Sequence, residues 1–164
     1  MRISNLKRHI VTCVLVGALL PAVPALAAID AYMVIKAEKQ GPIKGEAMSE
    51  KIAITSVSHD TVMASAGMAS GKRQHGAITI RKEVDAASPK LFQAMNSHEG
   101  LSDVTIVFRG GAAKAVETLD LKDAMITAVR TSGRTETITI EYGTIQVTYV
   151  NGNKTAIDDW NAPS

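Results

Sequence analysis

Glu83-Val84-Asp85-Ala86-Ala87-Ser88-Pro89-Lys90-Leu91-Phe92 is the stretch at which an alternating sequence pattern gives way to a helical one. The residues before it alternate in polarity, which is the pattern of a half-buried strand, with one face formed by Ile78, Ile80 and Val84. Ser88 is predicted to cap a helix by accepting a hydrogen bond from a free N–H of its first turn, and Pro89 suits the first helical position. The sequence therefore predicts a strand that leads into a capped helix.

The predicted helix is short and has one apolar face. Leu91, Phe92 and Met95 fall on that face, and Gly100 is predicted to end the helix. We expect Leu91 and Phe92 to close the core, and Asp85 and Ser88 to bond to backbone groups at the corner between strand and helix. A capped amphipathic helix accounts for all of these residues without an active site.

The composition is that of one globular domain. The chain has 164 residues, of which 46% are hydrophobic and 21% are charged. It contains two Phe, three Tyr and one Trp, which leaves few aromatic surfaces on which bases or sugars could stack. The predicted core is therefore aliphatic, with methionine.

Residues 1–27 have the layout of a secretory signal peptide. A basic start precedes an apolar run from Ile10 to Leu20, which is short for a membrane span, and cleavage is expected after Ala27. These residues hold three of the 18 basic residues and none of the 16 acidic ones, so residues 28–164 have a formal net charge of −1. We therefore expect a secreted or periplasmic domain with no stable membrane anchor and no nucleic-acid partner.

Most of residues 28–164 have the pattern of short strands and turns. Strands are expected at 29–36, 50–59, 77–84, 102–109 and 116–126, with a turn at 41–46 that contains Gly45. In a final hairpin the apolar phase slips at Gly143, which predicts a β-bulge at a sharp corner. The predicted fold is mainly β, a small β-barrel of two packed antiparallel sheets with one short α-helix.

A long segment of small residues lies between two of these strands. It runs from Ser58 to Gly76 and includes Met63 to Arg73. Loops of this length are uncommon in compact domains unless they bind something. We predict a contact surface here, with a mobile excursion that binds nothing as the alternative.

The central stretch and three others resemble the Hcp family, the haemolysin-coregulated proteins that form the tube of bacterial type VI secretion systems. The three others are Asp30-Ala31-Tyr32-Met33, Ile43-Lys44-Gly45-Glu46 and Ile145-Gln146-Val147-Thr148-Tyr149. The most specific part is the Lys-x-x-Asp-x-x-Ser-Pro run that begins at Lys82. Asp159-Trp160-Asn161 is also similar to the tryptophan segment that often closes such chains.

This resemblance implies a β-barrel that forms six-membered rings, which stack into a hollow tube. Such a ring needs head-to-tail contacts between two different surfaces of each subunit. The resemblance also implies that the long loop joins one ring to the next, through Met63, Met68, Lys72 and Arg73. It implies no catalytic residue and no cofactor; the implied partners are further copies of the chain, the sheath and spike proteins, and effectors carried in the lumen.

The predicted leader departs from the family pattern. Hcp tubes assemble in the cytoplasm and are fired outward, whereas a cleaved leader would deliver this chain unassembled to the periplasm. The alternative function is that of an exported Hcp-like protein, periplasmic or extracellular, that binds a ligand or forms fibres without taking part in contractile injection.

Two other classes of function can be weighed from the residues. A copper site is a minor alternative, because Met63, Met68 and His75 share one loop and His59 and His98 lie elsewhere, but their spacing matches no metal motif. Methionines that fill apolar contacts explain the same residues. The chain has no motif of a nucleophilic hydrolase, zinc protease or phosphate-binding loop, and its single cysteine, Cys13, lies in the leader, so we predict that it is not an enzyme.

Overall fold

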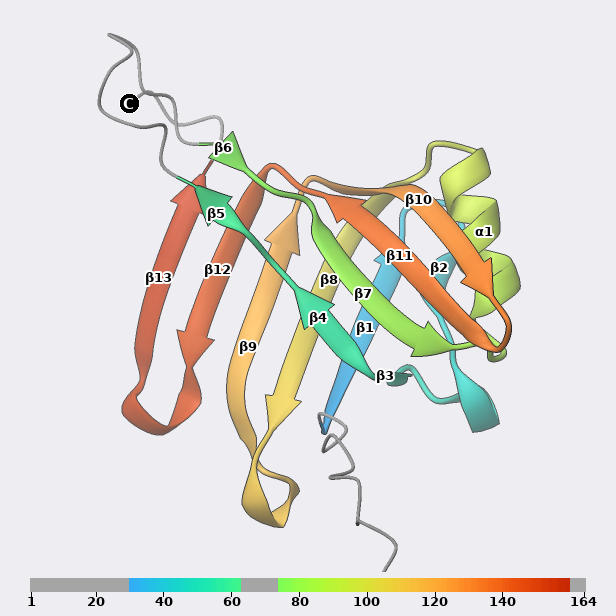
Figure 1. The fold of residues 1–164 in the computed structure, drawn as a ribbon. Coiled ribbons are helices and arrows are strands. Elements are labelled where there is room, and N and C mark those ends of the chain that lie inside the picture. Colours follow the sequence, from blue (N-terminus) through green and yellow to red (C-terminus); the bar gives the residue numbers. More distant parts are fainter. Residues whose placement is uncertain (1–29, 63–73, 160–164) are drawn as a thin grey trace, which may run out of the picture.

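The computed structural model describes residues 30–62 and 74–159. In that part of the chain, eleven short antiparallel strands form one sheet that curls over itself, and the other elements are a two-stranded ribbon, one α-helix and three short 3-10 helices (Figure 1). The prediction of a mainly β fold with one α-helix is confirmed. The two predicted sheets are the two layers of this one curled sheet. The leader and the residues Met63, Met68, Lys72 and Arg73 lie outside the described ranges.

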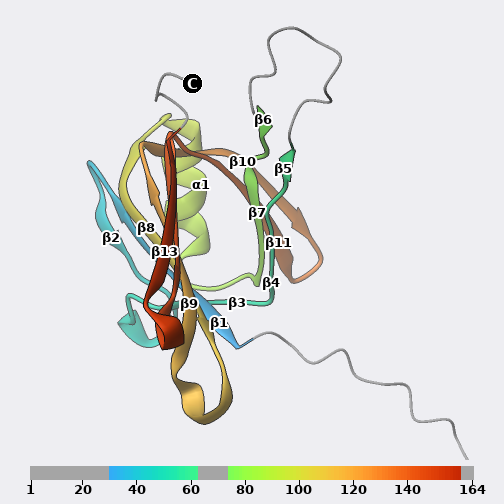
Figure 2. The ribbon, with the colours of Figure 1, turned by 90° about the vertical axis from the view of Figure 1, so that its left-hand side faces the viewer.

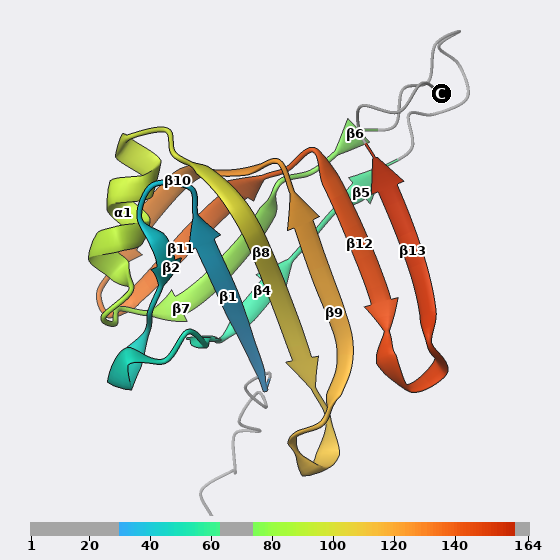
Figure 3. The same ribbon diagram turned by 180° about the vertical axis from the view of Figure 1, so that it is seen from behind.

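The first layer is built on the pairing of β1 with β8. β8 also pairs with β9, which pairs with β12, and β12 pairs with the edge strand β13 (Figure 3). On its other side β1 pairs with two short strands, β2 and β3. The bounds of these strands are β1 Ala31–Ala37, β2 Gly41–Ile43, β3 Ile52–Ile54, β8 Gly100–Arg109, β9 Ala115–Lys122, β12 Thr144–Tyr149 and β13 Lys154–Asp159.

The second layer faces the first across the core, with helix α1 between the layers at one end (Figure 2). Its strand order is β10, β11, β7 and β4. The bounds are β4 Ser56–Ser58, β7 Ile78–Glu83, α1 Ser88–Asn96, β10 Ala124–Ser132 and β11 Thr135–Glu141; the ribbon consists of β5 Thr61–Val62 and β6 Gln74–His75; the 3-10 helices are η1 Glu46–Met48, η2 Gly111–Ala113 and η3 Val150–Gly152. None of the helices in the described ranges is long and apolar enough to cross a bilayer.

Two strand pairs pass from one layer to the other at a shared corner. β9 continues into β10 at Asp123, which has a positive φ of 51°, and β11 continues into β12 at Gly143. The N–H of Gly143 donates to the carbonyls of Lys122 and Asp123, at 3.0 and 3.1 Å. Asp123 therefore divides the single strand predicted at 116–126 into β9 and β10, and Gly143 lies at the corner beside it.

The β-bulge predicted at Gly143 is wrong. The register is the same on both sides of the corner, as shown by the pairs Lys122 with Thr144 and Met125 with Glu141. The buried side of the strand changes at the same level in both chain segments, at Asp123 in one and at Gly143 in the other, so no extra residue is inserted at the glycine. The extra residue of this strand pair is Thr127, where the register shifts within β10. The predicted final hairpin is also wrong, because β11 pairs with β10 and β7 whereas β12 pairs with β9 and β13.

The core between the layers is aliphatic, as predicted. Its largest fully buried apolar side chains include Met33, Ile35, Ile43, Ile52, Ile78, Ile80, Leu91, Ile106, Leu121, Ile126 and Ile138. Two residues predicted to be in this core are half-exposed, Val84 at 47% and Phe92 at 51%. Val84 lies beyond the end of β7, and the buried face of α1 is formed by Ser88, Leu91 and Ala94, which leaves Phe92 on the outer side.

Both ends of α1 differ from the prediction. Ser88 is not the cap, because the residue before the helix is Ala87 and no side chain caps the first turn. At the other end His98 has a φ of 49°, its N–H donates to Met95, and the N–H of Glu99 donates to Ala94. These two bonds form a Schellman motif, which ends the helix before Gly100. Gly100 is instead the first residue of β8.

Two segments after β1 also differ from the prediction. Gly41–Ile43, predicted as part of a turn, forms β2, and the turn proper lies at residues 38–40. The predicted strand at 50–59 is two strands, because β3 pairs with β1 in the first layer and β4 pairs with β7 in the second. Gly45 does lie in a tight connection, where its N–H donates to the carbonyl of Ser49 and an added Cβ would be 3.3 Å from the carbonyl oxygen of Lys51.

Candidate functional site

The face of the first layer that points away from the core is polar. Paired residues on antiparallel strands share a face, so the register gives rows that cross β8, β9, β12 and β13. The rows contain Val107, Thr118, Thr148 and Thr155; Thr105, Asp120, Gln146 and Ile157; and Asp103, Lys122, Thr144 and Asp159. We call these twelve residues the polar face. Ten of the twelve side chains are polar or charged, so the face is suited to contact with water.

Hydrogen bonds between strands compensate several groups of the polar face. Thr105 donates to Asp120 at 2.7 Å, and Lys122 donates to Asp103 at 2.7 Å. The hydrogen bond from Lys122, together with its charge, holds the pKa of Asp103 below its usual value, and the same contact raises the pKa of Lys122. The polar face has one cationic side chain, Lys122, and three carboxylates, Asp103, Asp120 and Asp159, so its formal net charge is −2.

Strands at both ends of the first layer have an unpaired edge within the described ranges. β13 pairs only with β12, and β2 and β3 each pair only with β1. β13 is almost fully exposed, and its Ile157 is 65% exposed. An unpaired edge presents free N–H and C=O groups, to which a strand of another chain can pair.

A buried polar cluster connects the start of α1 to the second layer. Lys82 is fully buried, and its ammonium donates to Asp85 at 2.6 Å, to Glu136 at 3.2 Å and to Ser88 at 3.2 Å. Ser88 in turn donates to Glu136 at 2.6 Å. We call Lys82, Asp85, Ser88 and Glu136 the buried cluster. Its cation and two carboxylates satisfy one another where little water has access, since the side chains of Asp85 and Glu136 are only 12% and 6% exposed.

The predicted backbone roles of Asp85 and Ser88 are present in this cluster. The carboxylate of Asp85 accepts from the N–H of Ala87 at 2.9 Å, and the hydroxyl of Ser88 accepts from the N–H of Asp85 at 3.0 Å. Pro89 lies in the first turn of α1, as predicted. The sequence did not lead us to predict roles for Lys82 and Glu136. Lys82 falls on the same face of the alternating strand as Ile80, and this position indicated that its side chain points toward the core.

A second buried carboxylate fixes the turn between β1 and β2 to the end of α1. Glu99 accepts hydrogen bonds from the N–H groups of Lys39 and Gln40, at 2.6 and 2.8 Å, and from the side chain of Gln40 at 3.1 Å. Burial raises the pKa of Glu99, but these hydrogen bonds together outweigh burial and leave the pKa below its usual value. The carboxylate is therefore held ionised in the folded chain.

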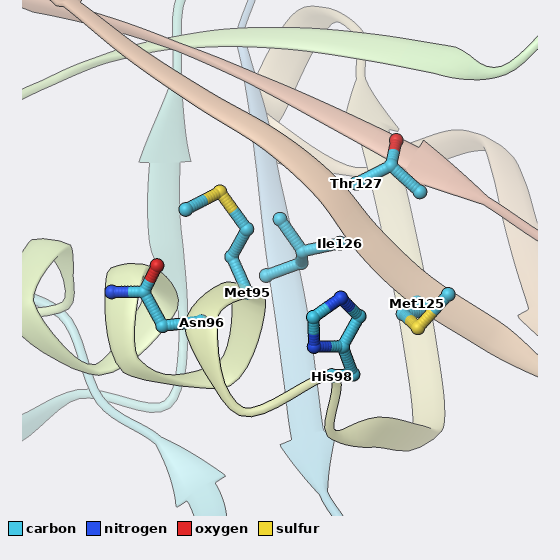
Figure 4. A pocket seen from close by; sticks show the side chains of 6 residues that line it. All are labelled: Met95, Asn96, His98, Met125, Ile126 and Thr127. Atoms are coloured by element: carbon cyan, nitrogen blue, oxygen red, sulfur yellow. The ribbon is translucent and has the colours of Figure 1, made fainter.

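One pocket lies between the last turn of α1 and the first residues of β10. Its volume is about 310 Å³, and it is lined by Met95, Asn96, His98, Met125, Ile126 and Thr127 (Figure 4). Met95 and Met125 are half-buried, whereas His98 is exposed. In the view of Figure 4 the imidazole lies between the two methionine side chains.

The histidines considered for a metal site are separated in the fold. His59 forms a 2.7 Å hydrogen bond with the hydroxyl of Tyr142, whereas His98 lines the pocket. Burial raises the pKa of Tyr142, and the charge of Asp158 raises it further. Within the described ranges no group of three or more His, Cys, Asp or Glu side chains comes together to hold a metal ion. The sites predicted at Met63, Met68, Lys72 and Arg73 fall outside those ranges.

Comparison with known proteins agrees with this architecture. A family described as "Type VI secretion system effector, Hcp" matches residues 32–149. The chain is 27% identical over 168 aligned residues to the Major exported protein of Pseudomonas aeruginosa, covering 83% of this chain and 98% of that protein.

Solved structures agree with the same assignment. Secreted protein Hcp3 from Pseudomonas aeruginosa has a TM-score of 0.69 and 26% identity, over 80% of this chain and 99% of that one. The Hcp1 protein from E. coli EAEC 042 shares the fold, with a TM-score of 0.74 and 22% identity, over 81% of this chain and 100% of that one. Because the family match spans well over half of the sequence, the chain belongs to the Hcp family of type VI secretion system proteins.

Proposed function

We propose that this chain is a tube protein of a type VI secretion system, a structural and non-enzymatic subunit that assembles into hexameric rings. The observation that carries the proposal is the Hcp family match across residues 32–149. The curled antiparallel sheet with a single α-helix in the described ranges supports it, since solved Hcp structures share this fold. The rings then stack into a hollow tube.

The unpaired edges of the first layer support a head-to-tail ring. A closed ring needs two different surfaces on each subunit, and β13 lies at one end of the layer while β2 and β3 lie at the other. Pairing of these edges between neighbours would satisfy their free backbone groups, and the neighbouring strand would then flank Ile157 on the polar face. The polar face would then continue from subunit to subunit and line a water-filled lumen.

The contacts between rings are a further part of the proposal. We assign them to the segment that contains Met63, Met68, Lys72 and Arg73, which the sequence places between β5 and β6. Methionine and long basic side chains can cover a partner surface of varied shape. Effectors held in the lumen, and the sheath and spike proteins of a type VI system, are the other partners.

The route of export decides between two forms of this function. We propose that residues 1–27 are a leader removed after Ala27, and a related protein is named Major exported protein. A processed chain outside the cytoplasm would support an exported Hcp-like role that does not use contractile injection. Mass spectrometry of the protein isolated from the cytoplasm, the periplasm and the medium tests this, because an intact leader on cytoplasmic protein would contradict cleavage.

Native mass spectrometry and electron microscopy of the purified protein test the assembly. We expect hexamers and ring-shaped particles, and a monomer at every concentration would overturn the proposal. Ile157→Lys places a charge on the β13 edge and should reduce the hexamer fraction. Val84→Lys, at another half-exposed apolar residue that is not on β13, is the matched control and should leave the hexamer fraction unchanged.

A further inference from the structure

The core side of the first layer is not covered along its whole width. In the middle of the layer the residues on this side are buried, since Leu119 on β9 is 5% exposed and Ile145 on β12 is 3% exposed. Tyr149 and Ala156 lie on the same side near the turn between β12 and β13, where Tyr149 is 46% exposed and Ala156 is exposed as well. Within residues 30–62 and 74–159, the cover that the second layer gives to the core therefore stops before this corner of the sheet (Figure 1).

The ring of Tyr149 is the main apolar group in this uncovered area. Tyr149 is the last residue of β12, and its ring lies against the hairpin turn, since a Cβ added at Gly152 would be 3.3 Å from its Cδ1. Its partners in the register are Glu117 on β9 and Lys154 on β13, which carry opposite charges. We call Glu117, Tyr149, Lys154 and Ala156 the open end. An aromatic ring with polar groups around it is typical of the centre of a protein–protein contact.

A second exposed aromatic side chain lies at the opposite end of the molecule. Helix α1 closes the core there with the face formed by Ser88, Leu91 and Ala94. Phe92 points away from that face and is 51% exposed. Figure 1 shows α1 and β13 at opposite ends, so the open end and Phe92 lie on two different surfaces of the chain. Removing both rings from water would be favourable in proportion to their apolar area.

The strand directions determine how two copies can meet. The antiparallel pairings make β13 run in the same direction as β1, whereas β2 and β3 run in the opposite direction. Rotation about an axis along the layer preserves strand direction, so β13 of one subunit would meet β2 and β3 of the next as antiparallel neighbours. Because α1 lies on the core side of its own first layer, it would then lie beside the core side of β12 and β13 of that neighbour (Figure 2).

We propose that Phe92 on α1 of one subunit packs against Tyr149 on β12 of the neighbouring subunit, so that the helix covers the open end. This inference rests on the ring of the proposed function and adds a side-chain contact to the strand edges assigned there. A second copy is the partner because the two exposed rings belong to the same chain and each lies beside one of those edges. Two aromatic rings in contact stabilise an interface beyond the area that they bury.

Opposite charges at the two positions test the contact. Phe92→Glu and Tyr149→Lys should each lower the hexamer fraction severalfold, as measured by native mass spectrometry, because each places a charge against an aromatic ring in the junction. Coexpression of the two variants should restore hexamers in which they alternate in equal numbers. In such a ring one kind of junction pairs the new carboxylate with the new ammonium, and the other kind is the parental one. The circular dichroism of each variant should match that of the parent, which shows that the loss is not one of folding.

A matched control makes the outcome decisive. Val84 is apolar and 47% exposed but precedes the helix, so Val84→Glu should leave the hexamer fraction unchanged and should not restore hexamers when coexpressed with Tyr149→Lys. If the parent forms hexamers but both single variants do so equally well, or if coexpression gives no alternating hexamers, the inference is overturned and the proposed ring stands. A parent that is monomeric at every concentration would contradict both.

Discussion

Replacement of Lys82 by methionine is expected to destabilise the protein strongly. The Lys82 side chain is fully buried, and its ammonium lies within hydrogen-bonding distance of two carboxylates, of Asp85 at 2.6 Å and Glu136 at 3.2 Å. Methionine has a similar stem, so Lys82→Met removes the cation with little change in packing. The side chains of Asp85 and Glu136, which are only 12% and 6% exposed, would then lack their common cation.

The expected loss in the free energy of unfolding is about 3–5 kcal/mol, which is typical when one partner of a buried ion pair is removed. Two contacts limit the loss, because Asp85 keeps the N–H of Ala87 and Glu136 keeps the hydroxyl of Ser88. For a chain of this length the loss corresponds to a fall in Tm of roughly 6–20 °C. Lys82→Met/Glu136→Gln removes one of the stranded charges, so the double variant should be less destabilised than the sum of its single variants.

Urea denaturation at pH 7 measures these differences. Lys122→Met is the matched control, since the side chains of Lys122 and Asp103 form an ion pair while 59% and 50% exposed, and it should cost less than about 1 kcal/mol. If Lys82→Met costs no more than Lys122→Met, or if the costs of Lys82→Met and Glu136→Gln simply add, the reasoning about the buried cluster is refuted.

Three further predictions concern single residues. The pKa of Glu99 is lower in the folded chain than in the unfolded chain, so its carboxylate stabilises the fold at pH values above the unfolded-state pKa and loses this effect as the pH falls through the folded-state pKa. Glu99→Gln should therefore flatten the fall of Tm below about pH 4.5. An unchanged dependence of Tm on pH would contradict this. Gly133→Ala should cost about 1–2 kcal/mol in urea denaturation, because φ is 61° there, whereas Gly111→Ala, where an added Cβ meets no atom within 4 Å, should be nearly neutral. Leu91→Ala should cost about 2–5 kcal/mol and Phe92→Ala clearly less, and equal costs would show that Phe92 packs in the core.

Local sequence patterns predicted the types of the elements better than their connections. The alternation in β1, β7 and β8 and the helix that contains Pro89 were correctly predicted, because side-chain period depends on neighbouring residues alone. The phase slip at Gly143 was a real irregularity, but its interpretation required the partner strand. The apolar phase of the partner strand changes at Asp123, beside Gly143, so the irregularity is a corner of both strands and not a bulge in one.

The polar residues show the same division. Asp85 and Ser88 bond to backbone groups within three residues, so their roles could be predicted from local sequence. Glu99 bonds to Lys39 and Gln40, about sixty residues away, and no local pattern predicts that pairing. The pocket lies between the end of α1 at Asn96 and the start of β10 at Ala124, which is 28 residues later in the sequence. It could therefore be recognised only from the fold.

The sequence by itself determined the β-rich fold, the helix that begins at Ser88 and the Hcp family, because alternation, the proline of the first helical turn and the Lys-x-x-Asp-x-x-Ser-Pro run are all local. Only the tertiary structure decided that the lysine of that run is buried. Lys82 lies opposite Glu136 in the pairing of β7 with β11, and the buried ammonium depends on a carboxylate 54 residues away. A charge can be placed in a core only when the fold supplies its partner, and that partner is not encoded in the residues beside it.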